Sequence, residues 1–256
     1  MNLFYRIIGD GKPLFILHGL FGNSDNWQSL ANKLANYNKV ILVDQRNHGR
    51  SFHDEKFDYN VMVEDLENLF RLLKIKDASL MGHSMGGKTA MKFSLEHPML
   101  VDKLIVVDIS PRRYPVHHDY IIEALCALKV SEYEKREEVD KALAKKIDNA
   151  AVRQFLLKNL GRDSNHKLAW KINLPVIKRN LKKIVEEIKS NRSFNGPSLF
   201  IAGERSHYVK PADESKIRKL FPDSTITYFK NVGHWIHAEA PDKFCDTVSS
   251  FINPES

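Results

Sequence analysis

The feature that most constrains the fold is an alternation of short apolar runs with amphipathic helical segments along the first 110 residues. Runs that are rich in Val, Ile, Leu and Phe and only about four to eight residues long are typical of buried strands. Residues 59–74 carry apolar side chains every three or four positions, which predicts a helix, and another helix is predicted over 89–95. Alternating strands and helices predict an α/β fold, in which a mostly parallel central sheet has helices on both faces. The apolar runs lie at residues 3–8, 13–18, 40–44, 78–83 and 103–108.

The alternation stops at about residue 114, and no convincing strand occurs between there and residue 191. This segment has the pattern of amphipathic helices, as in YIIEALCALKV and VIKRNLKKIVEEIK. After it, SLFIAG (198–203) and TITYFK (225–230) resume the strand pattern, and DKFCDTVSSFI predicts a last helix. Because the sheet pattern continues, we expect one α/β core formed by residues 1–111 and 196–256, with residues 112–195 inserted as a helical cap.

Length and composition are those of an ordinary globular protein, and 256 residues are enough to bury a large core. No secretion signal follows Met1, and no apolar run approaches the roughly 18 residues of a membrane span. We therefore expect a cytoplasmic protein. Cys126 and Cys245 lie far apart and form no metal-binding motif. We expect two buried thiols in a reducing compartment, although a disulfide between them stays open.

The basic excess of the chain is concentrated in the segment from Arg112 to Arg192, which holds 19 Lys and Arg against 11 Asp and Glu. The rest of the chain holds 20 against 21. Such an excess is compatible with solvated helix faces, or with a field that attracts an anionic substrate. Nucleic acid is not expected as a partner, because acidic residues are interspersed at helical spacing and no recognised nucleic-acid-binding motif is present.

The segment MGHSMGGKTAM matches two patterns that imply unrelated chemistries. From Gly82 to Gly86 it is G-x-S-x-G, the nucleophile elbow of serine hydrolases. From Gly82 to Thr89 it is also G-x-x-x-x-G-K-[ST], a phosphate-binding P-loop, in which Lys88 would reach the phosphates and Thr89 would bind Mg²⁺. Asp108, at the end of LIVVD, would then be the second magnesium ligand. Both patterns place a turn between a strand and a helix, so the local sequence does not decide between them.

Two distant motifs favour the elbow. HGLFG follows an early predicted strand and can present backbone N–H groups to an oxyanion, so we expect the donors to be Leu20 and Met85, with Phe21 as the alternative to Leu20. NVGHW follows the last predicted strand and supplies His234, in the order nucleophile, acid, histidine. A P-loop protein requires neither motif. We therefore interpret Ser84 as the nucleophile and the P-loop match as a coincidence.

The ordered motifs HGLFG, DQRNHGRS, GHSMGGK, VVDISP and GHWIHAE resemble the α/β-hydrolase superfamily over the whole chain, and the YbfF-type esterases in particular. The resemblance implies an α/β-hydrolase fold. DQRNHGRS corresponds to the superfamily loop D-x-R-G-H-G-x-S, with Asn47 where glycine is usual. We expect Arg46 and His48 to form a structural scaffold near the site rather than to take part in chemistry.

The triad acid departs from the usual pattern. The superfamily commonly places it after the strand that corresponds to SLFIAG, but Ser206 stands where an aspartate is expected. A serine cannot stabilise an imidazolium. The YbfF-type resemblance places the acid at Asp108, whose strand end is close enough to the histidine loop for this role. We expect Asp108 to be the acid, with Glu204 and Asp213 as alternatives.

The expected reaction is two-step acyl transfer without a metal or organic cofactor. His234 removes the Ser84 proton, Asp108 orients the imidazole, and the alkoxide attacks the carbonyl of a carboxylic ester or an acyl thioester. The basic cap makes an anionic leaving group a secondary hypothesis. Other triad chemistries on this fold remain alternatives, namely a carbon–carbon bond hydrolase, an aminopeptidase or a lyase, as does a non-catalytic ligand-binding protein. Acyl length and oligomeric state are not encoded in any recognisable pattern.

The remaining candidates are aromatic residues and histidines. Phe21, Tyr208 and Trp235 are expected to form walls of the substrate pocket, although aromatics at such positions are equally common in the core. His83 and His237 are expected to be packing residues rather than bases, His83 because alternation along its strand turns it away from Ser84. A further pair, His117 and His118, begins the insertion and has no third ligand at metal-binding spacing.

Overall fold

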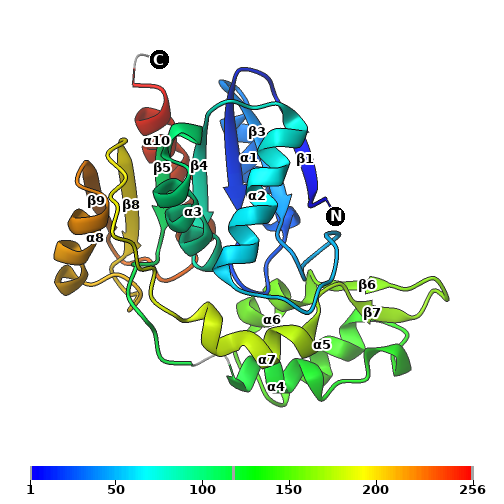
Figure 1. Ribbon diagram of the computed structural model, residues 1–256. Coiled ribbons are helices and arrows are strands. Elements are labelled where there is room, and N and C mark those ends of the chain that lie inside the picture. The colour runs from blue at the N-terminus through cyan, green and yellow to red at the C-terminus, as the bar shows by residue number, and fades with distance from the viewer. Residues whose placement is uncertain (1, 117–118, 255–256) are drawn as a thin grey trace.

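The computed structural model describes residues 2–116 and 119–254, and a mixed β-sheet forms its centre (Figure 1). Within these residues the sheet has seven strands in the order β1-β3-β2-β4-β5-β8-β9. Strand β1 is antiparallel to β3, and all other neighbouring strands are parallel. The predicted α/β class and its strands are confirmed. The strands are β1 (Phe4–Ile8), β2 (Lys12–Leu17), β3 (Asn38–Asp44), β4 (Ala78–His83), β5 (Val101–Val107), β8 (Ser198–Gly203) and β9 (Ser224–Phe229).

Helices cover both faces of the sheet (Figure 1). One face packs against α1 (Gln28–Leu34) and α10 (Pro241–Ile252), and the other against α2 (Tyr59–Leu73) and α3 (Met85–Glu96). The fully buried strand β2 shows why its sequence is a continuous apolar run: Leu14 and Ile16 belong to the first core, and Phe15 and Leu17 to the second. Helix α8 (Glu214–Leu220) also contributes to the second core, and α9 (Ile236–Glu239) follows β9. Short 3₁₀ helices occupy Ser24–Asn26, Pro98–Leu100, Val130–Glu132 and Pro211–Asp213.

Helix α3 begins at Met85, four residues before the predicted range. Gly86 and Gly87 therefore lie inside the first turn of α3 and do not precede the helix. A Cβ atom on Gly86 would lie 2.4 Å from the carbonyl oxygen of Leu17. Glycine is needed here because the helix starts in direct contact with strand β2, not because the chain breaks.

The segment between β5 and β8 lies beyond the carboxyl ends of the parallel strands (Figure 1). It contains four helices in its described residues, and also a hairpin that the sequence did not predict. The two hairpin strands are three residues long, too short for an alternating pattern to register, and they join through a turn in which Asp163 accepts the N–H groups of Asn165 and Lys167. The helices are α4 (Asp119–Cys126), α5 (Arg136–Ala144), α6 (Ala150–Leu157) and α7 (Leu174–Ile184), and the hairpin is β6 (Leu160–Arg162) with β7 (Leu168–Trp170).

The two cysteines differ in their surroundings. Cys245 is buried in α10, as expected, but Cys126 is exposed, so the prediction of two buried thiols is wrong for Cys126. Helix α4 buries Ile121, Ile122 and Leu125, and Cys126 follows these residues on the other side of the helix. Both thiols are free. Among the described residues, no helix is both long and apolar enough to span a membrane.

Candidate active site

Ser84 stands on a sharp turn between strand β4 and helix α3. Its backbone has φ 53° and ψ −117°, a conformation that is strained for any residue with a side chain. A Cβ atom on Gly82 would lie 2.1 Å from the carbonyl oxygen of Gly86, so strand and helix approach too closely for other residues. The Ser84 N–H donates to the Val107 carbonyl at 3.0 Å. These contacts fix a nucleophile elbow, which leaves the serine partly exposed.

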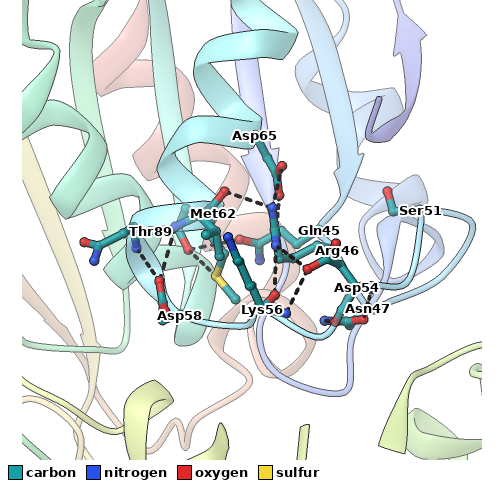
Figure 2. Close-up of polar contacts among 12 residues, drawn as sticks. Gln45, Arg46, Asn47, Ser51, Asp54, Lys56, Asp58, Met62, Asp65 and Thr89 are labelled. Atoms are coloured by element: carbon teal, nitrogen blue, oxygen red, sulfur yellow. Dashed lines mark hydrogen bonds and ion pairs between the residues drawn. The ribbon is translucent and has the colours of Figure 1, made fainter. Parts of the chain in front are cut away.

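The side chains that the P-loop pattern requires have protein partners. Lys88 is buried, and its ammonium donates to backbone carbonyl groups. Thr89 Oγ1 lies 3.0 Å from Gln45 Oε1 and 3.4 Å from the sulfur of Met62 (Figure 2). It also lies 3.2 Å from the Met85 carbonyl oxygen. These contacts leave neither side chain available to a nucleotide phosphate or to Mg²⁺.

Asp108 directly follows strand β5 and is completely buried. Its Oδ1 accepts a hydrogen bond from the Gly203 N–H at 2.9 Å. Its Oδ2 accepts one from the Ser206 hydroxyl and lies 2.7 Å from His234 Nδ1. The structure therefore brings Asp108 and His234 together. Ser206, at the position where the superfamily commonly has its acid, holds the carboxylate in place.

The two alternative acids do not contact His234. Glu204 Oε2 accepts the N–H of Asn231 at 2.9 Å. Asp213 forms an ion pair with Arg112, with 3.1 Å between Oδ1 and Nε. Both carboxylates have structural partners on loops beside the site.

His234 lies in the loop after β9, between an aromatic ring and a second histidine. The Tyr208 ring stacks on it, with 4.1 Å between the ring centroids. His83 Nε2 lies 2.9 Å from the His234 carbonyl oxygen, and because a carbonyl only accepts, this nitrogen carries the proton. With Nδ1 donating to Asp108, the Nε2 atom of His234 carries the lone pair. An imidazole held in this way beside an elbow serine can act as its base.

The neighbouring histidines are neutral packing groups. Burial lowers the pKa of His83 well below its ordinary value. His237 is 7% exposed and stacks on Trp27 with ring centroids 4.1 Å apart. Burial lowers the pKa of His237 to about 3, so it does not exchange protons near neutrality. His117 and His118 lie outside the described residues.

Leu20 and Met85, the expected oxyanion donors, line a cavity together with Ser84. Leu20 is in the loop after β2, and Met85 is the first residue of α3. A Cβ atom on Gly19 would lie 3.2 Å from that of Ser84, which shows how closely the loop passes the serine. Within residues 2–116 and 119–254 neither N–H group has a hydrogen-bond acceptor. The alternative donor, the Phe21 N–H, is bonded to His48 Nε2 at 3.2 Å.

The loop DQRNHGRS holds Phe21 in place through His48 and is itself fixed by Arg46. Arg46 makes a bidentate ion pair with Asp65, with N–O distances of 2.5 and 2.8 Å, and also donates to the Lys56 carbonyl (Figure 2). His48 Nδ1 lies 2.9 Å from the Arg46 carbonyl, and burial lowers the pKa of His48 to about 3. The neutral ring can therefore donate through Nδ1 and accept the Phe21 N–H through Nε2. Both residues have the scaffold role that the sequence suggested.

Asn47, which replaces the usual glycine, has φ 63°. Asparagine tolerates this left-handed conformation better than most residues. Its side-chain oxygen accepts the Asp54 N–H at 2.9 Å and lies 3.1 Å from the amide nitrogen of Asn173 (Figure 2 shows Asn47 with Asp54). Asn173 also caps helix α7. The substitution therefore links the loop to the segment between β5 and β8.

A cavity of about 220 Å³ opens at Ser84. Phe21, Tyr208 and Trp235 line it, as does His234. A narrower cavity of about 30 Å³ on another side of Ser84 is lined partly by Lys88. An outer cavity of about 590 Å³ shares Trp235 with the first. The sequence did not identify the wall that the segment between β5 and β8 contributes to the first cavity, namely Tyr120, Ile121, Val152, Phe155 and Leu156.

An amphipathic helix shows from its sequence which face is apolar, but not which cavity that face lines, so no signal in the sequence assigned these residues. In the described part of the chain, no group of three or more His, Cys, Asp or Glu residues could hold a metal ion. The reactive groups that the described residues bring to the cavity are the Ser84 hydroxyl, the His234 imidazole and the Asp108 carboxylate.

Comparisons with known proteins show the family of the chain. The model of the α/β hydrolase fold family matches residues 12–143. The sn-1-specific diacylglycerol lipase ABHD11 of Mus musculus is 39% identical over 263 residues, which cover 98% of this chain and 85% of that protein. Esterase YbfF of Escherichia coli K12 is 34% identical over 247 residues, which cover 95% of this chain and 94% of that protein. The solved structure of a marine microorganism esterase matches with a TM-score of 0.96 and 41% identity, covering 98% of this chain and 99% of that one. The chain belongs to the α/β-hydrolase superfamily, together with the YbfF-type esterases it was predicted to resemble.

Proposed function

We propose that this protein is a serine esterase that hydrolyses carboxylic esters through an acyl-enzyme on Ser84. The observation that carries the proposal is the 2.7 Å contact between Asp108 and His234 beside the strained turn at Ser84. Relatives that align over nearly the whole chain are named as esterases and lipases. Residues 112–195 are proposed to be the cap of this enzyme, because their side chains form a wall of the cavity at Ser84.

In the proposed mechanism His234 Nε2 removes the proton from Ser84 Oγ, and Asp108 stabilises the imidazolium that forms. The alkoxide attacks the ester carbonyl and gives a tetrahedral intermediate. Its oxyanion accepts hydrogen bonds from the N–H groups of Leu20 and Met85. The imidazolium then protonates the departing alcohol. A water molecule, deprotonated by His234, attacks the acyl-enzyme and releases the acid and Ser84.

The cavity at Ser84 is suited to an apolar acyl group, since Ile121, Val152 and Leu156 form much of its cap side. The outer cavity has polar side chains in its lining, among them Asn149, Gln154 and Lys158. The alcohol portion is proposed to lie in the outer cavity, past the aromatic pair Phe155 and Trp235 that lines both spaces. The ring centroids of this pair are 5.8 Å apart.

The charges around these cavities favour a neutral alcohol over an anionic thiol as the leaving group. Some cations of the cap are paired, as in the Arg153–Asp140 and Arg179–Glu55 ion pairs. In the outer cavity Lys158 faces a site that also contains the carboxylate of Glu239. A strongly anionic group would meet little net positive charge there.

The proposed function is tested by hydrolysis of p-nitrophenyl esters of increasing acyl length, with acyl-coenzyme A thioesters as the anionic comparison. We expect the wild-type protein to hydrolyse the neutral esters with higher kcat/KM than the thioesters, and the Ser84→Ala variant to hydrolyse neither. If the wild-type protein hydrolyses no ester, or if Ser84→Ala retains the activity, the proposal is wrong.

A further inference from the structure

Lys88, the lysine of the P-loop pattern, lies one turn beyond Ser84 on helix α3. Its N–H donates to the Ser84 carbonyl at 3.0 Å, and the residue is 1% exposed. Its ammonium reaches the backbone of both chain connections between core and cap. It donates to the Arg112 carbonyl at 2.9 Å where the chain leaves β5, and to the carbonyls of Val185, at 3.5 Å, and Glu186 after helix α7.

The rings of two tyrosines, Tyr59 and Tyr114, lie beside the Lys88 ammonium. The ammonium lies 5.9 Å from the Tyr59 ring centroid and 4.9 Å from that of Tyr114. The Tyr59 hydroxyl donates to the Ile184 carbonyl at 2.6 Å, and the Tyr114 N–H donates to the Val185 carbonyl at 2.9 Å. Lys88 is therefore the centre of a cluster that joins the two connections to each other and to α3.

The same cluster reaches the histidine of the site. The Tyr114 hydroxyl donates to the carbonyl of Tyr208, whose ring stacks on His234. The narrow cavity beside Ser84 is lined by Lys88, Tyr114 and Tyr208 together. A shift of the two connections would therefore move the wall that covers the serine and the imidazole.

An apolar side chain would fill this space without the penalty of burying a charge. An ammonium has three N–H donors, and here three carbonyl groups accept from it, so the charge is satisfied only while both connections are in place. We propose that Lys88 is a positioning residue, which holds both connections of the cap and thereby fixes the wall of the substrate cavity over Ser84 and His234. The proposal rests on the esterase function proposed above.

The proposal includes a pH dependence. Burial lowers the pKa of Lys88 to about 7. Among its charged neighbours, Arg112 and Lys216 lower this pKa, whereas Glu186 and Glu187 raise it. The tyrosines that face it stay neutral, since burial raises the pKa of Tyr59 well above 10.0 and that of Tyr114 to about 12.

A neutral amine has two N–H donors and a lone pair, so one of the three carbonyl groups loses its partner. The hold on the cap connections therefore weakens as the pH rises through about 7. We expect the KM for an ester that fills the cap cavity to rise between about pH 6 and about pH 8.

The test compares Lys88→Met with Lys92→Met, which removes a lysine from the next turn of α3, where it pairs with Glu96 at 2.6 Å. We expect Lys88→Met to raise the KM for a long-chain ester about tenfold, while kcat for a short acetyl ester changes less than about threefold. The KM of Lys88→Met should also be independent of pH over the range in which that of the wild-type protein rises. Hydrogen exchange should accelerate at residues 112–116 and 184–188.

If Lys88→Met matches Lys92→Met in KM, in its pH profile and in exchange, the proposal is overturned. Should Lys88→Met fail to fold, Tyr59→Phe removes one hydrogen bond of the same cluster and is expected to raise the same KM by a smaller factor. An unchanged KM in Tyr59→Phe, together with a flat wild-type KM against pH, would equally overturn the proposal. A wild-type protein that hydrolyses no ester would instead contradict the proposed function.

Discussion

The Asp108→Asn variant removes one buried negative charge while nearly preserving the shape of the side chain. In the native site Oδ1 accepts the Gly203 N–H at 2.9 Å, and Oδ2 faces His234 Nδ1 at 2.7 Å. Because the Gly203 N–H can only donate, the new amide oxygen must keep the place of Oδ1. The amide NH₂ group must then face the imidazole.

An NH₂ group in that place donates to His234 Nδ1 and forces the ring proton onto Nε2. This is the nitrogen that must accept the proton of Ser84, so the imidazole holds the wrong tautomer for general-base catalysis. Loss of the base and of the orienting carboxylate lowers kcat by about 10³- to 10⁴-fold. At about 1.36 kcal/mol for each factor of ten, the variant loses about 4–5.5 kcal/mol of transition-state stabilisation.

The assay is steady-state hydrolysis of a p-nitrophenyl ester by the wild-type protein, by Asp108→Asn and by the control Glu204→Gln. Glu204 bonds to the Asn231 N–H and does not contact His234, so we expect the control to keep kcat within about threefold. Melting temperatures establish that each variant is folded. The reasoning is refuted if folded Asp108→Asn keeps more than about a tenth of the wild-type kcat, or if Glu204→Gln loses as much activity.

Two further predictions concern stability. Gly86→Ala places a methyl group 2.4 Å from the Leu17 carbonyl and should lower the free energy of unfolding by about 1–3 kcal/mol; a midpoint of urea unfolding equal to that of the wild-type protein would contradict this. The pKa of His237 is lowered to about 3 in the folded protein, so below about pH 6.5 the unfolded chain binds a proton that the native state excludes. The free energy of unfolding therefore falls as the pH falls from about 6.5 towards 3. His237→Phe keeps the stacking on Trp27 and removes this proton, so it should reduce the slope of the unfolding free energy against pH by up to about 1.4 kcal/mol per pH unit. Urea unfolding at about pH 4, 5 and 6 measures that slope. An unchanged slope would refute the assignment.

The sheet could be predicted from the sequence because its strands are covered on both faces. Phe15 and Ile16 are buried in opposite cores, so β2 is apolar throughout and its short length marks it as a strand. The hairpin β6–β7 escaped prediction because three-residue strands carry no pattern. Cys126 was wrongly expected to be buried because a lone cysteine gives no indication of which side of a helix it occupies.

The site was partly predictable because elbow, oxyanion loop and histidine loop each carry a short motif at the end of a strand. Because position 206 holds a serine and not an aspartate, Asp108 was the expected acid, but nothing in the sequence indicated that the serine hydroxyl would donate to its carboxylate. The contacts of Lys88 could not be predicted either, because Glu186, one of its acceptors, lies 98 positions away along the chain. Contacts between a core side chain and a distant backbone carbonyl leave no residue-type signature.

The central claim is that Ser84 is an activated nucleophile. The most direct measurement is mass-spectrometric mapping of the site labelled by a fluorophosphonate probe, with native and heat-unfolded wild-type protein and native Asp108→Asn compared. The account predicts that the probe modifies Ser84 in native but not in heat-unfolded wild-type protein. In native Asp108→Asn it should modify Ser84 far more slowly than in the native wild-type protein. Native, folded protein in which Ser84 stays unlabelled, or labelling at equal rates before and after unfolding, would contradict it.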